Sequence, residues 1–297
     1  MTRPEAGEVE TVSTGLRRIL APNPSPMTHW GTNSFILGEG EIAIVDPGPE
    51  DARHFEGLMR ATTGETVTHI LVTHAHADHS PLARQLSKVT GAPVYAFGAP
   101  DAGRSDVMTR LHRSGLAGGG EGVDQGFLPD QVVTEGDRIE GHGWSVDVLH
   151  TPGHFAGQLS FAFGDAILSG DHVMDWSSSL VSPPDGDISA FMKTSYRLRD
   201  HGAAVLLPGH GATIHDPADR LNWLIGHREA RESSILDALG PRPRDLMAIT
   251  DAVYPEAPPN MLPAAARNVF AHLIDLVDRN LVTATPELAV TSQFRLA

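Results

Sequence analysis

The run His69-Ile70-Leu71-Val72-Thr73-His74-Ala75-His76-Ala77-Asp78-His79 decides the fold of this chain. Residues 69–72 form a short apolar run, which predicts a strand buried on both faces. The next segment places three imidazoles and one carboxylate within 74–79. Histidines this dense repel one another when protonated, and a buried ring without a partner leaves a polar atom unsatisfied. A divalent metal ion removes both problems, so the run predicts a metal-binding loop rather than a chance cluster of histidines on a solvated loop.

Three later segments repeat the pattern of a strand that ends in a ligating residue. These strands are expected at 145–149, 166–168 and 204–207. Glycine-containing turns follow them and deliver His154, Asp171 and His210. Because sites in α/β folds collect at strand ends, we expect these side chains to meet the first run. The pool of candidate metal ligands is His74, His76, Asp78, His79, His154, Asp171 and His210.

Composition limits what this pool can be. The 297 residues include 16 His and no Cys, so a disulfide framework, a thiolate nucleophile and a Cys-ligated metal are excluded. Lys and Arg number 22 against 37 Asp and Glu, which gives a net charge of −15 and disfavours nonspecific binding to nucleic acid or anionic membranes. Neither a signal-peptide core nor a membrane-spanning apolar stretch is found, so a cytoplasmic location is expected.

Alternating strands and helices are expected in the first two thirds of the chain, and helices after that. A hairpin at 33–46 precedes helices at 50–61 and 80–89 and a strand at 93–96, and later come a strand at 158–161 and a helix at 187–201. Segment 98–130 is a glycine-rich insertion, for which a lid and a disordered loop are equally expected. Helices at 221–239, 244–254 and 264–280 followed by a strand at 281–283 predict a winged helix. We therefore expect domains 1–216 and 217–297.

The ordered motifs HxHxDH, TPGH, GD and PGHG resemble those of the metallo-β-lactamase superfamily over roughly residues 30–215. The resemblance implies an α/β fold, an αββα sandwich, with two metals at one edge. It also implies how the ligands divide between the metals, which the residues alone leave open. The first metal would take His74, His76 and His154, the second Asp78, His79 and His210, and Asp171 would bridge them.

The C-terminal part resembles the winged-helix extension of the β-lactamase-like protein 2 group. The motifs that carry this likeness are His227-Arg228, Arg231-Glu232, Tyr254, Asn268–Leu273 and, before the expected helix at 187–201, Pro184–Asp187. Two segments depart from the superfamily pattern, Ser80-Pro81-Leu82 after the ligand run and Phe155-Ala156-Gly157-Gln158 after His154. Both change the pocket wall beside the metals and leave the ligands intact, so they put the substrate in doubt and not the metal site.

The ligand set predicts a dinuclear hydrolase with two zinc ions, with iron and manganese as alternative metals. A hydroxide shared by two ions would attack an ester, thioester or related carbonyl of a small-molecule substrate. Asp78 would orient this nucleophile or pass its proton to the leaving group. A mononuclear iron enzyme like the persulfide dioxygenases is an alternative from the same superfamily, and β-lactam hydrolysis is expected only as a weak side activity.

RNA cleavage, an activity known in the β-lactamase-like protein 2 group, is the other alternative. Residues 217–297 hold 8 Arg and 10 Asp or Glu, a net charge of −2, whereas winged helices that grip phosphates are basic. We therefore expect the winged helix to be an interdomain or homodimer element rather than an RNA-binding one.

Several neighbours of the ligands are expected to be structural. His172 should point away from the ligands, and His150 should support a ligand residue or pack. Asp46 is open between supporting a ligand histidine and forming a turn, and Trp176 with Ser177–Ser179 is open between pocket lining and plain loop. The two arginines at i, i+3 spacing, Arg228 and Arg231, are expected to form ion pairs along their helix.

Overall fold

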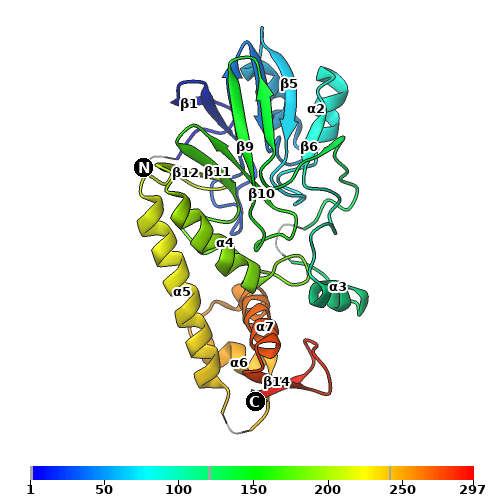
Figure 1. The fold of residues 1–297 in the computed structure, drawn as a ribbon, viewed down its shortest axis with the longest axis vertical. Coiled ribbons are helices and arrows are strands. Elements are labelled where there is room, and N and C mark those ends of the chain that lie inside the picture. The colour runs from blue at the N-terminus through cyan, green and yellow to red at the C-terminus, as the bar shows by residue number, and fades with distance from the viewer. Residues whose placement is uncertain (1–2, 120–121, 241) are drawn as a thin grey trace.

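Two β-sheets packed face to face form the larger part of the structure, and a mostly helical region lies beneath them (Figure 1). The structure is a computed structural model that describes residues 3–119, 122–240 and 242–297. The segment Gly118–Gly120 of the expected insertion and the expected helix end at Gly240-Pro241 thus fall partly outside the described residues.

The first sheet has seven strands in the order of the sequence. They are β1 (Val9–Ser13), β2 (Leu16–Leu20), β3 (Asn33–Glu39), β4 (Glu41–Val45), β5 (Thr66–Leu71), β6 (Val94–Ala96) and β7 (Gln131–Val132). The expected hairpin is the antiparallel pair β3–β4, whereas β5 and β6 join in parallel. Strands β1 and β2 were not predicted, because charged and small residues interrupt the apolar pattern of 9–20.

The second sheet has five strands in the order β12-β11-β10-β9-β8. They are β8 (Arg138–Gly141), β9 (Trp144–His150), β10 (Leu159–Phe163), β11 (Ala166–Gly170) and β12 (Val205–Pro208). Side chains such as Leu71 from the first sheet and Phe161 and Leu207 from the second form one buried cluster between the sheets. Each sheet thus buries its inner face against the other.

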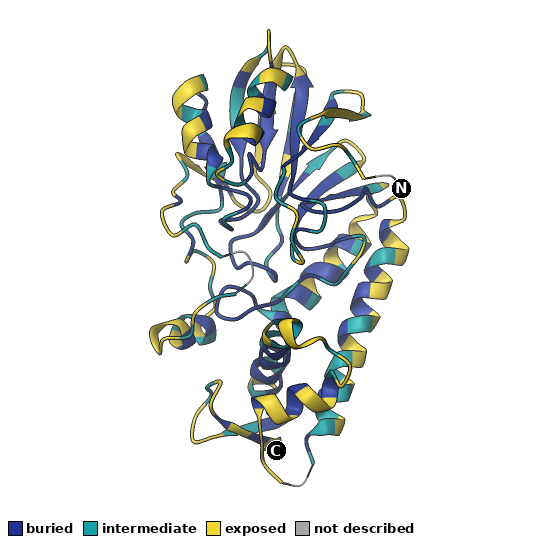
Figure 2. Cartoon of the chain, turned by 180° about the vertical axis from the view of Figure 1, so that it is seen from behind, coloured by how far each residue is buried: buried dark blue, intermediate teal, exposed yellow. Residues whose placement is uncertain are grey.

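Helices cover the outer face of each sheet and complete the αββα sandwich. Leu58 of α1 (Ala52–Ala61) and Leu86 of α2 (Leu82–Thr90) pack on the first sheet. Phe191 of α4 (Ile188–His201) and Leu221 of α5 (Pro217–Ala238) pack on the second. Figure 2 shows this layering, because the helices turn buried faces inward and exposed faces outward. The predicted fold class is confirmed.

The C-terminal region combines helices with a small sheet. Its elements are the C-terminal half of α5, β13 (Arg244–Asp245), α6 (Leu246–Val253), the 3-10 helix η1 (Pro259–Met261), α7 (Leu262–Asp278), β14 (Val282–Thr285) and β15 (Gln293–Leu296). A helix expected from residue 244 begins at Leu246 instead, because the Asp245 side chain caps it by accepting from the Ala248 N–H. Strand β15 lies between β13 and β14 and forms the wing. The domain boundary at 216/217 stays a prediction, since α5 spans both regions.

Segment 98–130 is ordered in part, and the lid interpretation stays a prediction. It contains helix α3 (Asp106–Arg113), whose Met108 and Leu111 pack into the core of the C-terminal region beside Phe270. The sequence pattern did not reveal this helix, because only one short side of it is apolar. Among the helices of the described ranges, none is long and apolar enough to cross a membrane.

One buried histidine of α7 should make stability depend on pH. Burial, reinforced by the Arg228 charge, lowers the pKa of His272 to about 3, and neither ring nitrogen has a hydrogen-bond partner among the described residues. Below the ordinary pKa of about 6.5 the unfolded chain therefore binds a proton that the folded chain does not, so stability falls as pH falls. Between about pH 7 and pH 5 this costs about 2 kcal/mol.

We expect His272→Leu to lose that part of the pH dependence. Urea unfolding of the wild type and the variant at both pH values measures it. Equal pH dependence of the two proteins would show that His272 is protonated in the folded state.

Candidate metal centre

The loop after β5 and the ends of three strands of the second sheet meet at one edge of the sandwich. All seven predicted ligands are buried there. Their candidate ligand atoms form two groups, within each of which the atoms lie within 4.8 Å of one another. One group holds His74, His76, His154 and Asp171, and the other holds Asp78, His79 and His210. This grouping matches the division that the family resemblance implies, and the ligand roles themselves remain predictions.

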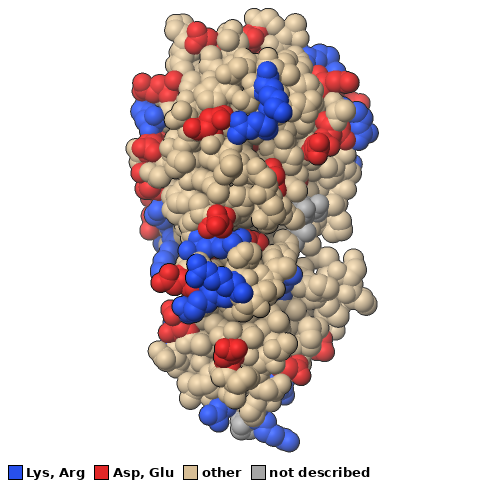
Figure 3. Space-filling model, turned by 90° about the vertical axis from the view of Figure 1, so that its right-hand side faces the viewer, with Lys and Arg blue, Asp and Glu red and all other residues tan. Residues whose placement is uncertain are grey.

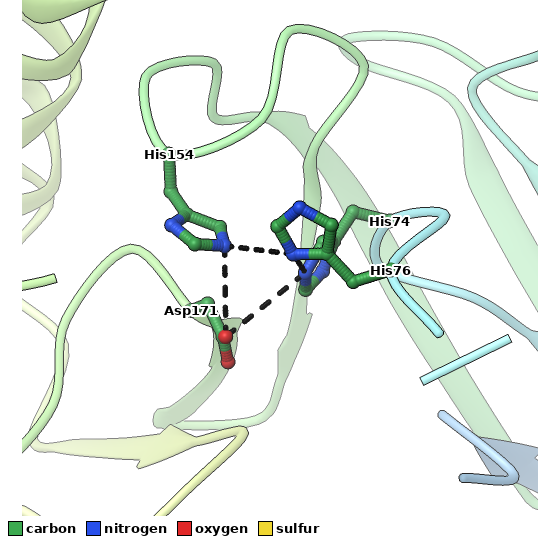
Figure 4. Close-up of side chains that lie close together, drawn as sticks. All are labelled: His74, His76, His154 and Asp171. Atoms are coloured by element: carbon green, nitrogen blue, oxygen red, sulfur yellow. Dashed lines mark hydrogen bonds and ion pairs between the residues drawn. The ribbon is translucent and has the colours of Figure 1, made fainter. Parts of the chain in front are cut away.

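In the first group the ring nitrogens converge on one point (Figure 4). His76 Nδ1 lies 2.9 Å from His74 Nε2 and 3.0 Å from His154 Nε2. The Asp171 Oδ2 atom lies 3.6 Å from His154 Nε2 and 4.0 Å from His74 Nε2. Three nitrogens and one carboxylate oxygen therefore face a common centre, as the ligands of a single ion would.

The second group lies on the other side of Asp171. His210 Nε2 lies 3.0 Å from Asp78 Oδ2, and His79 Nε2 lies 3.5 Å from the same oxygen. Asp171 contacts this group too, with Oδ1 at 3.4 Å from His79 Nε2 and Oδ2 at 3.3 Å from His210 Nε2. Its carboxylate is thus within reach of both groups, which suits the predicted bridging position.

Partners outside the two groups orient the histidine rings. The Nδ1 atoms of His79, His154 and His210 lie 2.9 Å from Asp46 Oδ2, 2.6 Å from the Leu180 carbonyl and 3.1 Å from the Gly31 carbonyl. Each acceptor holds a ring proton on Nδ1 and turns Nε2 toward the centre.

His74 is oriented by a hydroxyl group. The Thr73 Oγ1 atom donates to Asp46 at 2.7 Å and lies 3.0 Å from His74 Nδ1, so it accepts the ring proton of His74. Asp46 also accepts from the Thr73 N–H at 2.7 Å, at a backbone φ of 49°. For Asp46 the sequence left two interpretations open, a turn and the support of a candidate ligand histidine. The structure shows the second, because Asp46 contacts His79 directly and His74 through Thr73.

The pKa shifts differ between the two groups. Burial, with the neighbouring imidazoles, lowers the pKa of His76 to about 3 and keeps that of His74 well below its usual range, so both rings are neutral. Burial acts the same way on His210, but the Asp171 and Asp78 carboxylates outweigh it and raise its pKa to about 10. The pKa of His79 shifts upward for the same reason.

The residues present fit two divalent cations. The candidate ligand atoms in the two groups are imidazole nitrogens and carboxylate oxygens. These are the groups that bind zinc in proteins where cysteine is not used. His79 Nε2 and Asp171 Oδ1 are buried and form no hydrogen bond among the described residues, although they lie 3.4 Å from each other, and a cation would satisfy both atoms. A Cβ atom at Gly209 would lie 2.4 Å from Asp171 Oδ1, so only glycine leaves this corner free.

Of the other residues singled out beside the ligands, some pack away from the site and some line the pocket. His172 points away from the ligands, stacks on Phe191 and lies 3.0 Å from Ser195 Oγ, and His150 stacks on Phe97. Trp176, Ser177 and Ser178 line the pocket above the metal groups, whereas Ser179 is buried and bonds to the His172 carbonyl.

The expectation for the two arginines of α5 was wrong. No carboxylate of the described residues lies within ion-pair distance of Arg228 or Arg231. Arg228 is buried and donates to the Ser179 carbonyl and to Asn268 Oδ1. Arg231 donates to the Val253 carbonyl and lies 4.0 Å over the Tyr254 ring. The i, i+3 spacing shows only that both point to one side of α5, and that side turned out to be the pocket and the loop beside it.

A cavity of about 380 Å³ extends from the metal groups to the C-terminal helices. His76, Asp78, His154, Asp171 and His210 lie at one part of its wall. The C-terminal region contributes His227, Arg231, Tyr254, Ala257, Pro258, Met261, Ala264, Ala265 and Asn268. Sequence reasoning did not place this wall at the site. His227, Arg231, Tyr254 and Asn268 stood out only as motifs of the C-terminal likeness, and the small and apolar residues between them carry no site signal. The backbone carbonyls of Gly31 and Leu180 have no sequence signal at all.

Comparison with known proteins gives the same two regions. Residues 27–224 match the family model described as Metallo-beta-lactamase superfamily, and residues 246–288 match the Beta-lactamase associated winged helix domain. The Beta-lactamase-like protein 2 homolog of Drosophila melanogaster is 31% identical over 282 residues, 90% of this chain and 89% of that protein. An Atrochrysone carboxyl ACP thioesterase of Aspergillus fumigatus is 27% identical over 258 residues, 84% of this chain and 72% of that protein.

Solved structures show the same fold over nearly the whole chain. A Beta-lactamase domain protein from Burkholderia ambifaria has a TM-score of 0.80 at 22% identity and covers all of this chain and 95% of its own. A metallo-beta-lactamase family protein from Thermus thermophilus has a TM-score of 0.77 at 24% identity, with 97% of this chain and 100% of that chain covered. The combination of sandwich and C-terminal region is therefore shared.

Proposed function

The chain belongs to the metallo-beta-lactamase superfamily and is a metallo-hydrolase with a complete ligand set, and we propose that it holds two zinc ions and cleaves an ester, thioester or related carbonyl compound. One observation carries this proposal. Two adjacent groups of buried nitrogen and oxygen donors share the Asp171 carboxylate between them. That arrangement suits a pair of ions acting on one substrate.

The chain's own residues divide the work of hydrolysis. His74, His76 and His154 would hold one ion, Asp78, His79 and His210 the other, and Asp171 both. Bound there, the ions would supply Lewis acidity toward the carbonyl and toward water. Asp78 Oδ2 accepts from Thr32 Oγ1 at 3.4 Å and faces the cavity, where it can take a proton from water and pass it to the leaving group.

The cavity favours a carbonyl substrate with an apolar body. Met174, Trp176, Leu180, Met261 and Ala265 line it, and together they offer apolar contact and exclude water. The Arg231 guanidinium, without a carboxylate partner among the described residues, adds a donor for an acceptor or anionic group of the substrate. Relatives named as acyl carrier protein thioesterases support the choice of thioesters within this class.

The charges give less support to RNA cleavage. Arg220, Arg228 and Arg267 of the C-terminal helices donate to carbonyl groups of this chain instead of facing solvent as phosphate ligands. On the face shown in Figure 3, one compact group of basic side chains lies near the middle with acidic side chains at its edge, and the other basic side chains are scattered beside acidic ones. A small-molecule partner therefore fits better than a nucleic acid.

Asp78→Ala should strongly slow hydrolysis by the zinc-loaded protein. We expect the variant to hydrolyse acyl thioesters and aryl esters roughly 10³-fold more slowly than the wild type, since proton transfer by a positioned side chain contributes about that factor. Asp219→Ala, on the first turn of α5, is the control and should leave the rate unchanged. The same proteins are assayed on single-stranded RNA.

Metal analysis of the purified protein separates the candidate activities. Two zinc ions per chain with thioester or ester turnover supports the proposal. RNA cleavage that the Asp78→Ala variant loses, without carbonyl hydrolysis, would replace it by a phosphodiesterase, and one iron per chain would favour a dioxygenase.

A further inference from the structure

We propose that Arg228 and Asn268, two residues of the C-terminal helices, are positioning residues for the first metal group. They would act through the loop 172–183, which follows Asp171 and carries the carbonyl that orients His154. This inference rests on the proposed function, because it assumes that the group binds a metal ion. It assigns the C-terminal region a role in metal affinity besides lining the cavity.

The loop contacts the metal group directly through Leu180. The Leu180 carbonyl oxygen lies 2.6 Å from His154 Nδ1, while His154 Nε2 faces His76 and Asp171. A carbonyl only accepts hydrogen bonds, so it fixes the proton on Nδ1 and leaves Nε2 free to bind metal. The position of one backbone carbonyl therefore sets both the tautomer and the angle of the His154 ring.

The two residues beside Leu180 are held from the C-terminal region. The Val181 N–H donates to Asn268 Oδ1 at 3.1 Å, and Arg228 Nη2 donates to the Ser179 carbonyl. Arg228 Nη1 also donates to Asn268 Oδ1 at 3.2 Å, so the two side chains form one unit. The peptide groups before and after Leu180 are thus bound by α5 and α7, elements more than 40 residues further along the chain.

The chemistry of Arg228 points to this role rather than to a charge pair. Its side chain is 1% exposed, and no carboxylate of the described residues lies within ion-pair distance. A buried guanidinium is costly unless its donors are used, and here Nη2 serves the Ser179 carbonyl of the loop and Nη1 serves Asn268 Oδ1, whereas Nε has no partner among the described residues.

Two further arginines of the same helices hold the rest of the loop. Arg220 donates to the Met174 and Ser177 carbonyls, both at 2.6 Å. Arg267 donates to Ser182 Oγ at 3.1 Å and to the Pro183 carbonyl at 3.4 Å. Arginines of the C-terminal helices therefore contact this one loop along its length, and α5 and α7 lie side by side below the second sheet (Figure 1).

Asn268→Leu and Asn268→Asp test the inference on the full-length protein. Leucine matches the size of asparagine but removes the acceptor for the Val181 N–H and Arg228, whereas aspartate keeps it. Zinc affinity is measured by competition with a chromophoric chelator, and the His154 ring proton is followed by NMR. We expect Asn268→Leu to lower the affinity for one of the two zinc ions about 10- to 100-fold and to lose the His154 Nδ1–H signal. Asn268→Asp should keep the wild-type zinc affinity and the signal.

Two more variants keep the result interpretable. Thr250→Val removes a buried hydroxyl of α6 that donates to the Leu246 carbonyl of its own helix at 2.7 Å and has no other hydrogen bond among the described residues, so it should leave both affinities unchanged. Arg228→Lys keeps the charge but lacks the planar pair of Nη donors that binds both the Ser179 carbonyl and Asn268 Oδ1. It should therefore weaken the binding of the same zinc ion. This variant tests the inference if Asn268→Leu does not fold.

Each outcome bears on a different claim. Unchanged zinc affinity in folded Asn268→Leu and Arg228→Lys, or equal losses in Asn268→Leu and Asn268→Asp, would overturn the inference while the proposed function stands. A wild-type chain that binds no zinc would overturn the proposed function and, with it, this inference.

Discussion

Replacing Asp171 by asparagine should remove at least one of the two proposed zinc ions and lower the proposed hydrolysis by roughly 10³-fold. Asp171 is the residue whose carboxylate reaches both groups, with Oδ2 at 3.6 Å from His154 Nε2 and 3.3 Å from His210 Nε2. Asparagine has the same shape but carries no charge, so it cannot compensate two dications at once. Metal content by mass spectrometry and the rate of thioester hydrolysis measure the effect.

Asp165→Asn is the matched control for this change. Asp165 is an exposed residue in the turn that leads into β11, the strand at whose end Asp171 lies. We expect this variant to keep two zinc ions and full activity. An Asp171→Asn protein with both ions and normal turnover would show that the carboxylate does not bridge the groups.

Gly209→Ala, a change of one methyl group, should damage the same site by crowding. The new Cβ would lie 2.4 Å from Asp171 Oδ1 and 2.7 Å from His79 Cε1. Both side chains are buried, so neither can move away without disturbing the ligand geometry. We expect a loss of stability of about 1–3 kcal/mol and a drop in zinc affinity of about 10- to 100-fold, measured by urea unfolding and chelator competition.

Gly226→Ala separates crowding from the general effect of removing a glycine. Gly226 lies within α5, and a Cβ there meets no atom within 4 Å. Alanine favours a helix interior over glycine, so this variant should gain about 0.5–1 kcal/mol and keep its metals. A Gly209→Ala protein that kept its stability and its metals would contradict the close contact between the loop after β12 and the metal groups.

Much of the site was predictable because its ligands follow directly from local sequence. His74, His76, Asp78 and His79 lie in one short loop, and His154, Asp171 and His210 each follow a strand through a turn with glycine. The first four follow β5 of the first sheet and the other three follow strands of the second, so local patterns place each ligand at a strand end and the packing of the two sheets brings them together.

The helix α3 and the strands β1 and β2 were not predictable in this way. Met108 and Leu111 are a weak apolar pattern in isolation, and they form a helix that buries them because the C-terminal core offers Phe270 and its neighbours. Their secondary structure depends on contacts far along the chain, which no local window contains.

The sequence by itself determined the ligand types and their order, because these depend on patterns within a few residues, and it predicted a C-terminal winged helix from the succession of helices and a strand. The sandwich followed from the resemblance of the ordered motifs to a known superfamily. Only the tertiary structure decided what orients the ligands and what closes the cavity. Backbone carbonyls such as that of Leu180 are present at every residue and carry no pattern, so their use depends on where the chain folds. Arg228 illustrates the same point, because its spacing on α5 suggested an ion pair, whereas burial against the loop 172–183 gave it carbonyl partners instead.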